Sequence, residues 1–97
     1  MHARPIRFQA DPDRIDAATR HTEEVLLPLM RDTEGFRGFV SFGDRTTGAG
    51  IALSYWETED AMNASKETLS QARKEALDDA GAQSAPTIEH YEVLLQT

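Results

Sequence analysis

The clearest pattern of apolar and polar positions lies between residues 35 and 60, where two apolar runs flank a polar turn. Aromatic and β-branched residues favour strands, and they gather on both sides of this turn: Phe36, Phe39, Val40 and Phe42 before it, and Ile51, Leu53, Tyr55 and Trp56 after it. The turn itself, Asp44 to Gly50, contains Gly48 and Gly50, which allow the positive φ that a tight reversal requires. The pattern therefore predicts two antiparallel strands joined by a hairpin.

Both faces of this predicted hairpin carry apolar residues. Strand alternation puts Phe39 and Trp56 on one face, opposite a second set made of Phe36, Gly38, Val40, Phe42, Ile51, Leu53 and Tyr55. A sheet with one face in water should alternate apolar with charged residues, so we expect both faces to be covered. On folding, a chain of 97 residues buries only about 60–65% of the surface that it exposes to water when unfolded. A second subunit is the predicted cover.

A strand and a helix are predicted before the hairpin. Residues 4–9 alternate, with Ile6 and Phe8 on one side. Asp11 is expected to cap a helix that starts at Pro12 and runs to about Thr33, because Asp accepts free backbone N–H groups and Pro suits the first helical position. Pro28 predicts a bend near residues 24–28, or two shorter helices. The inward stripe is Ile15, Ala18, Thr22, Val25 or Leu26, and Leu29.

The C-terminal part predicts a second helix and a last strand. Thr58 precedes a run of good helix formers that should end at Gly81, with an inward stripe of Met62, Ser65, Leu69, Ala72 and Ala76. These side chains are mostly small, so the helix either sits close to the sheet or leaves space beneath it. After a link over 82–86, residues 87–96 alternate as a strand. The order βαββαβ predicts an α+β, ferredoxin-like domain over residues 1–97, with a four-stranded antiparallel sheet and two helices on one face.

Composition narrows the possible partners and compartments. The net charge of -7 and the lack of a Lys/Arg run oppose binding to nucleic acid or to an anionic membrane. No segment reads as a signal peptide or a spanning helix, and we expect a soluble, cytoplasmic protein. The chain has no cysteine, which excludes disulfides and thiolate chemistry.

The segments EGFRGFVSF, IALSYWETEDAM and IEHYEVLL resemble those of the dimeric α+β barrel proteins, close to the antibiotic biosynthesis monooxygenase-like branch. The resemblance covers nearly the whole chain. It implies that two sheets pair across a homodimer, with a pocket between each sheet and its helices. It also implies candidate activities such as cofactor-independent oxygenation of aromatic polyketides, heme degradation or lactone isomerisation. The heme-degrading branch has an Asn, a Trp and a His where this chain has Arg4, Ser65 and Glu75, so heme cleavage is not expected.

Two functions follow as hypotheses. The first is a monooxygenase-like enzyme, or binder, that needs no cofactor and holds a small aromatic or quinone-like ligand between sheet and helices. The second is a non-catalytic dimer with a role in interaction, stress response or regulation. The first requires an internal cavity, and the second predicts a filled interior. An RNA-binding module would need a basic surface around exposed aromatic residues, which the chain lacks.

Four residues are candidates for the site. His90 is the candidate catalytic residue, because a strand would hold it rigidly and histidine titrates near neutral pH, although a hydrogen-bonded packing residue is the more common role for a histidine in this setting. Trp56, Tyr91 and Tyr55 are candidates for stacking on a planar ligand, although aromatic residues on strands more often belong to a core or an interface.

The other polar residues have simpler explanations. His2 is terminal and His21 is expected on a solvated helix face, and the three histidines have no metal-binding spacing. No metal site is therefore predicted. Arg4 and Arg7 have the chemistry to hold an anionic group, although pairing with some of the 17 acidic residues is the simpler explanation.

Overall fold

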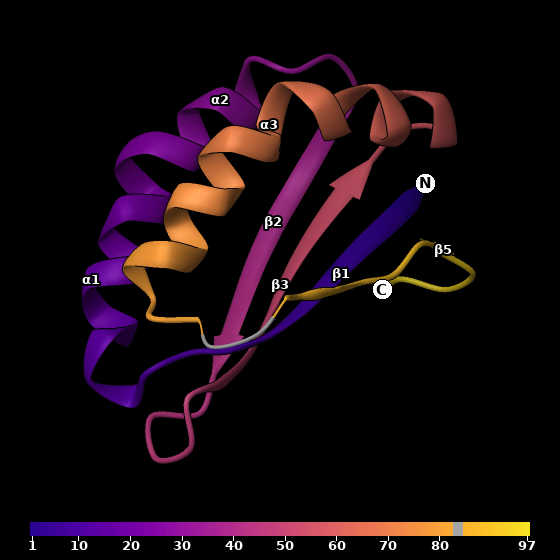
Figure 1. The fold of residues 1–97 in the computed structure, drawn as a ribbon. Helices are drawn as coiled ribbons and strands as arrows, with labels where there is room; N and C mark the ends of the chain where they lie inside the picture. The colour runs from indigo at the N-terminus through magenta and orange to yellow at the C-terminus, as the bar shows by residue number, and fades with distance from the viewer. Residues whose placement is uncertain (83–84) are drawn as a thin grey trace.

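The computed structural model describes residues 1–82 and 85–97; two residues of the predicted link, 83 and 84, lie outside the described part. Its main sheet is antiparallel and contains β1 (His2–Gln9), β2 (Phe36–Gly43) and β3 (Ala49–Trp56). Two short strands, β4 (Thr87–Ile88) and β5 (Tyr91–Glu92), both pair with β1, so the strand order is β2-β3-β1-β4. The helices all lie on one face of this sheet (Figure 1). This is the ferredoxin-like α+β arrangement that the sequence predicts.

The hairpin between β2 and β3 forms at the predicted turn. Asp44 Oδ1 accepts hydrogen bonds from the backbone N–H groups of Thr46 and Thr47, at 2.8 and 3.1 Å. Gly48 has φ of +83°, which confirms its predicted role. Gly50 has no positive φ and belongs to β3, so that prediction was wrong. It is needed for a different reason, because a Cβ at Gly50 would lie 2.5 Å from the Phe8 ring.

The first helical segment has four parts. They are the 3-10 turn η1 (Pro12–Arg14), α1 (Ile15–His21), the π-helical turn η2 (Thr22–Leu26) and α2 (Leu27–Arg31). Asp11 caps the start by accepting a hydrogen bond from Asp13 N, as predicted. In η2 the N–H of Leu27 reaches back five residues to the Thr22 carbonyl. The wider turn directly precedes Pro28, whose ring would crowd an ordinary helical turn.

The π turn changes which side chains face the sheet. One extra residue in a turn rotates everything after it by about 100° relative to a regular helix. Leu26 and Met30 are therefore buried, with Met30 only 3% exposed, whereas Leu29 is 40% exposed. The predicted inward position of Leu29 was wrong for this reason.

The second long helix, α3 (Glu59–Asp79), begins and ends as predicted. Thr58 Oγ1 accepts a hydrogen bond from Ala61 N, and the helix stops two residues before Gly81. Its buried side chains are those of the predicted stripe, Met62, Ser65, Leu69 and Ala72, with Ala76 half-buried.

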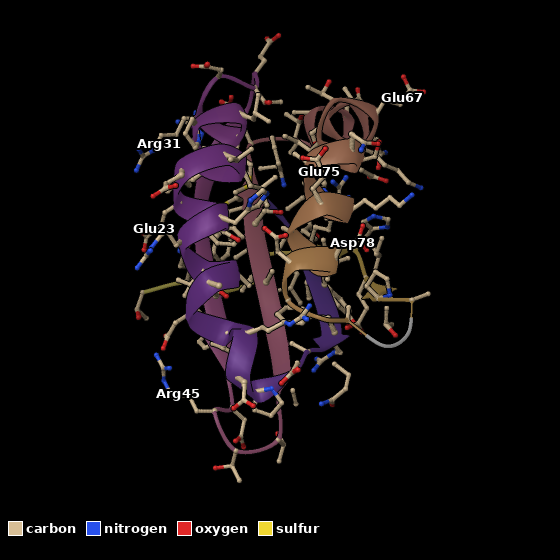
Figure 2. All side chains as sticks on the ribbon, turned by 60° about the vertical axis from the view of Figure 1, so that its left-hand side comes forward. Glu23, Arg31, Arg45, Glu67, Glu75 and Asp78 are labelled. Carbon is tan, nitrogen blue, oxygen red and sulfur yellow. The ribbon has the colours of Figure 1, made fainter. Side chains whose placement is uncertain are left out.

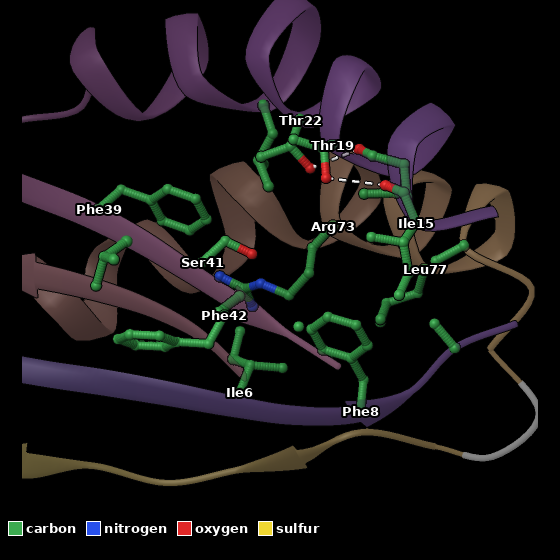
Figure 3. A pocket seen from close by; sticks show the side chains of 18 of the residues that line it. Ile6, Phe8, Ile15, Thr19, Thr22, Phe39, Ser41, Phe42, Arg73 and Leu77 are labelled. Carbon is green, nitrogen blue, oxygen red and sulfur yellow. Dashed lines mark hydrogen bonds between the residues drawn. The ribbon is translucent and has the colours of Figure 1, made fainter. Parts of the chain in front are cut away.

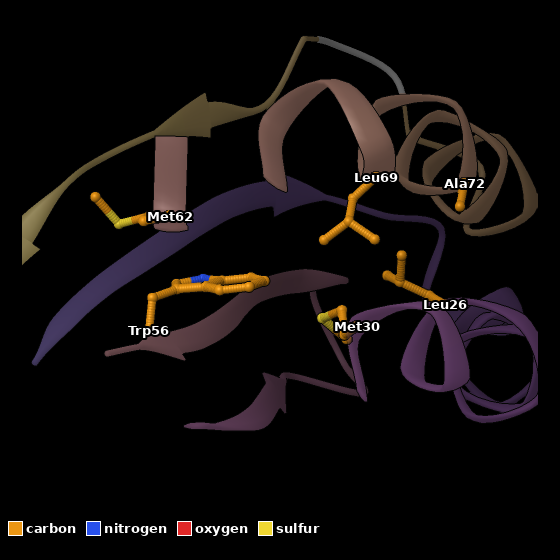
Figure 4. Close-up of a cluster of buried hydrophobic side chains, with 6 residues drawn as sticks. All are labelled: Leu26, Met30, Trp56, Met62, Leu69 and Ala72. Carbon is orange, nitrogen blue, oxygen red and sulfur yellow. The ribbon is translucent and has the colours of Figure 1, made fainter. Parts of the chain in front are cut away.

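The hydrophobic core lies between α3, the first helical segment and β3. It contains Leu26, Met30, Trp56, Met62, Leu69 and Ala72 (Figure 4). Trp56 is fully buried and donates a 2.9 Å hydrogen bond from Nε1 to Ser54 Oγ. Phe36 packs edge-on against Trp56 at a centroid distance of 5.6 Å. The expected grouping of Phe36 with Val40 and Phe42 was wrong, because a β-bulge between Phe36 and Gly38 breaks the alternation.

The last strand is shorter than the predicted 87–96. Only Thr87–Ile88 and Tyr91–Glu92 pair with β1, and Val93 N then donates to Met1 O at 2.8 Å. In the described residues the pairing with β1 ends at Glu92, which lies opposite His2. Leu94 and Leu95 are consequently 87% exposed. The helix-free sheet face carries Val40, Phe42, Ile51, Leu53 and Tyr55, so this face is apolar and open to solvent.

Candidate functional site

A cavity of about 540 Å³ lies between the sheet and the helices (Figure 3). Its floor comes from β1, β2 and β3, including Ile6, Phe8 and Phe39, and its roof comes from α1, η2 and α3. Three core residues, Leu26, Met30 and Leu69, form the boundary between the cavity and the packed core.

Small side chains explain why the space is not filled. Beyond Leu69 the lining residues include Ala76 on α3 and Ala80 directly after it, and on α1 they include Ala18. Alanine leaves open the volume that a Leu or Phe would occupy at the same position. Of the two outcomes left open by the small α3 stripe, the structure shows the one with space beneath the helix.

The mouth of the cavity lies beside the edge strand β2. The exposed lining residues Thr19, Glu23, Ser41 and Arg45 come from α1, η2, β2 and the hairpin. Arg45 Nη1 lies 2.8 Å from Asp16 Oδ1, so an exposed ion pair joins the hairpin to α1 at this opening. Arg45 and Glu23 extend outward from the molecule (Figure 2).

Arg73 brings a charged side chain into the cavity from α3. It comes from α3 and its side chain reaches into the cavity toward Ser41 (Figure 3). Burial lowers the pKa of Arg73, because a charged guanidinium loses hydration in an apolar setting. Among the described residues, none of the ion pairs involves Arg73.

Arg4 lies on the same sheet face as Ile6 and is fully buried. It donates from Nη1 to Ser65 Oγ at 3.2 Å and from Nη2 to the Met62 carbonyl, while its Nε has no partner among the described residues. Burial, and secondarily the charge of Arg73, lowers the pKa of Arg4 to about 10. Arg7 differs, because it pairs with Glu89 at 2.7 Å on the open face.

The four predicted site residues do not line this cavity. Trp56 belongs to the core, and Tyr55 lies on the open face. Tyr91 is 54% exposed, and its hydroxyl donates to Glu89 at 2.5 Å. His90 is exposed between β4 and β5, where the strand is interrupted. The structure brings none of them together, and a role for them in ligand binding stays a prediction.

Sequence reasoning missed Arg73 as a site residue. The signal was present in the α3 stripe, because Arg73 follows Leu69 by one helical turn and directly follows the buried Ala72. A charged residue at the edge of a buried stripe is usually placed in solvent, whereas Arg73 lines the cavity together with Ala76 and Ala80.

Residues 1–82 and 85–97 contain neither a clustered metal site nor a membrane-spanning helix. No group of three or more His, Asp or Glu side chains there is placed to hold a metal ion. Within the same residues, no helix combines the length and the apolar run that crossing a bilayer demands.

The sequence profile described as antibiotic biosynthesis monooxygenase matches residues 1–77. The chain belongs to the antibiotic biosynthesis monooxygenase family. This family member is 32% identical over 93 residues to the uncharacterized protein Rv2557 of Mycobacterium tuberculosis, covering 96% of this chain and 41% of that protein. It is 34% identical over 76 residues to Rv2558 of the same organism, covering 78% of this chain and 32% of that protein. The chain therefore spans less than half the length of these relatives.

Solved structures share the fold of this family member. A protein of unknown function from Nitrosomonas europaea, NE2512, has a TM-score of 0.76 at 20% identity, over 99% of this chain and 91% of that chain. The ActVA-Orf6 monooxygenase of Streptomyces coelicolor, solved with the ligand Nanaomycin D, has a TM-score of 0.75 at 18% identity, over 99% of this chain and 92% of that chain. At these identities the likeness concerns the fold alone.

Proposed function

We propose that this protein binds a small aromatic or quinone-like molecule in the cavity between its sheet and helices. The observation that carries the proposal is the cavity itself. Its volume of about 540 Å³ falls within the range of roughly 300–1,000 Å³ found for ligand pockets. Its walls pair the Phe8 and Phe39 rings with a few polar groups, which is the usual composition of a ligand site. The ActVA-Orf6 monooxygenase, which has the same fold, was solved with the ligand Nanaomycin D.

The family suggests monooxygenase-like chemistry without a cofactor. An electron-rich ligand would itself activate oxygen, and the protein would supply an apolar site that excludes water. Among the described lining residues, Glu23 is the only carboxylate, and no histidine or tyrosine is present. Ligand binding is therefore supported more directly than catalysis.

A thermal-shift screen of anthrones, quinones, flavins and heme tests the proposal. A ligand at about 100 times its Kd should stabilise the fold by roughly 2.7 kcal/mol. Ala76→Phe should abolish the shift by filling the cavity. Ala64→Phe, at an exposed position on the same helix, is the matched control and should leave the shift intact. The same shift in both variants would place the ligand elsewhere.

The open sheet face supports a homodimer. Phe42 is 53% exposed and pairs with Ile51, and Val40, Leu53 and Tyr55 continue the same face along the two strands. A contiguous apolar patch of this kind is typical of an interaction surface. Pairing of two such faces would bury it, as the family resemblance implies, and we expect the dimer to be cytoplasmic.

Sedimentation of the protein tests the dimer. Leu53→Lys places a charge on the open face and should yield monomers. Ala17→Lys, at an exposed position of α1, should leave the dimer intact. A wild-type protein that sediments as a monomer at micromolar concentration would contradict the homodimer.

A non-catalytic dimer is the second candidate function; the same open face supports it, but the cavity counts against it because this role predicts a filled interior. It requires that no member of the ligand panel binds. A dimer that gives no shift with any compound would favour this role over ligand binding.

A further inference from the structure

Two arginines lie between the sheet and α3 without an acidic partner in the part of the chain that the structure describes. Arg73 enters the cavity from α3, and Arg4 lies fully buried on β1. The ion pairs of the described residues involve Arg7, His21, Arg37 and Arg45. Arg4 and Arg73 are close enough for the charge of one to lower the pKa of the other. The interior therefore holds excess positive charge although the chain has a net charge of -7.

The nearby acidic residues do not neutralise this charge. Glu23 is exposed at the cavity mouth, and Glu75 and Asp78 lie on the solvent side of α3 (Figure 2). Buried charges in proteins are ordinarily paired. Arg4 keeps two hydrogen bonds to Ser65 and Met62, but these neutral groups supply no negative charge.

The hydrogen-bonding groups around Arg73 fit one kind of anion. A guanidinium presents parallel N–H donors that match the two oxygens of a carboxylate. The Ser41 hydroxyl points into the same part of the cavity (Figure 3) and can donate a further hydrogen bond. The hydroxyls of Thr19 and Thr22 instead donate to helical carbonyls, at 2.8 and 3.0 Å. A single inward guanidinium in an acidic protein favours a monoanion over a phosphate dianion.

We propose that the cavity selects aromatic molecules that carry a carboxylate, with Arg73 and Ser41 holding the carboxylate and Phe8 and Phe39 contacting the ring. This inference rests on the proposed function and names the ligand class of the same site. Arg4 adds a favourable positive potential from behind the cavity and makes no direct contact with the ligand.

Calorimetric titration with 2-naphthoate and 2-naphthamide tests the inference, because the two probes share shape and size but differ in charge. Wild-type protein should bind the naphthoate more tightly by about tenfold or more, as expected for a charge-assisted pair in an apolar site. Arg73→Gln should bind both probes with equal affinity. Arg31→Gln removes one exposed charge from α2 (Figure 2) and should keep the preference.

Each outcome has a distinct meaning. Equal binding of both probes by the wild type overturns the carboxylate preference and leaves the proposed ligand site standing. Failure of both probes to bind counts against the proposed site itself and against the inference with it. A preference that survives in Arg73→Gln would show that another group selects the anion. Retained naphthamide binding by Arg73→Gln demonstrates that the variant is folded.

Discussion

Arg7 Nε lies 2.7 Å from Glu89 Oε1, and the other carboxylate oxygen of Glu89 accepts a 2.5 Å hydrogen bond from the Tyr91 hydroxyl. This contact joins β1 to the C-terminal strands on the open face of the sheet. It lowers the pKa of Glu89, through Tyr91 first and Arg7 second, and raises the pKa of Tyr91.

The Tyr91 titration provides a pH-dependent prediction. In a Tyr55→Phe background, which leaves Tyr91 as the only tyrosine, phenolate absorbance should show a pKa above about 10. Glu89→Gln should lower this pKa toward that ordinary value. Because the folded pKa is the higher one, the contact stabilises the fold below about pH 10 and is lost as pH rises through the raised value. An unchanged titration in Glu89→Gln would show that the hydrogen bond does not persist in solution.

The π turn before Pro28 predicts opposite results at neighbouring positions. Met30→Ala should destabilise the protein by about 2–5 kcal/mol, because Met30 is buried in the core. Leu29→Ala should change stability by less than about 0.5 kcal/mol, because Leu29 faces solvent. Denaturant unfolding measures both values. A larger loss at Leu29 would mean that this helix is regular in solution.

Gly48 is predicted to tolerate no side chain. Its φ is +83°, and an added Cβ would lie 2.0 Å from the Ala10 carbonyl oxygen. Gly48→Ala should therefore destabilise the protein by more than about 1 kcal/mol. Gly43→Ala is the control, since a Cβ there would meet Ile15 at an ordinary 3.9 Å. Equal melting temperatures of the two variants would contradict the turn geometry.

Arg4 is predicted to weaken the fold it lies in. Arg4→Met roughly preserves volume, removes a buried unpaired charge, and leaves Ser65 Oγ bonded to the Met62 carbonyl at 2.6 Å. We expect stability to be unchanged or increased, by up to about 4 kcal/mol, as when buried ionic groups give way to apolar ones. Arg4→Ala, which leaves a void, should be less stable than Arg4→Met. A marked loss in Arg4→Met would indicate that the arginine has a structural role.

Local chemistry made much of the fold predictable. Capping and helix-starting preferences depend on residues that are near one another in the chain. They place helix starts correctly at Asp11, Pro12 and Thr58. The errors occur where one residue shifts a periodic pattern. The bulge between Phe36 and Gly38 changes the sheet face on which Phe36 lies, and the π turn changes the helix face on which Leu29 lies. The residue types along the sequence do not signal either irregularity.

The site was less predictable than the fold. Alanine at 76 and 80 is compatible with close packing or with a void, and only the final distance between helix and sheet decides between them. The side chain of Arg73 lines that void, so its position was no more predictable than the void itself. His90 was assigned to a strand interior, but β1 bonds the chain on either side of it and leaves it exposed.

The alternation along β3 separates two properties of the molecule. Ser54 borders the cavity, whereas its neighbours Leu53 and Tyr55 lie on the opposite side of the sheet. Because adjacent strand residues point in opposite directions, protein engineering can alter the chemistry of the cavity at one position and the proposed contact between subunits at the next. The proposed ligand preference and the proposed assembly are thus open to independent redesign within a single strand.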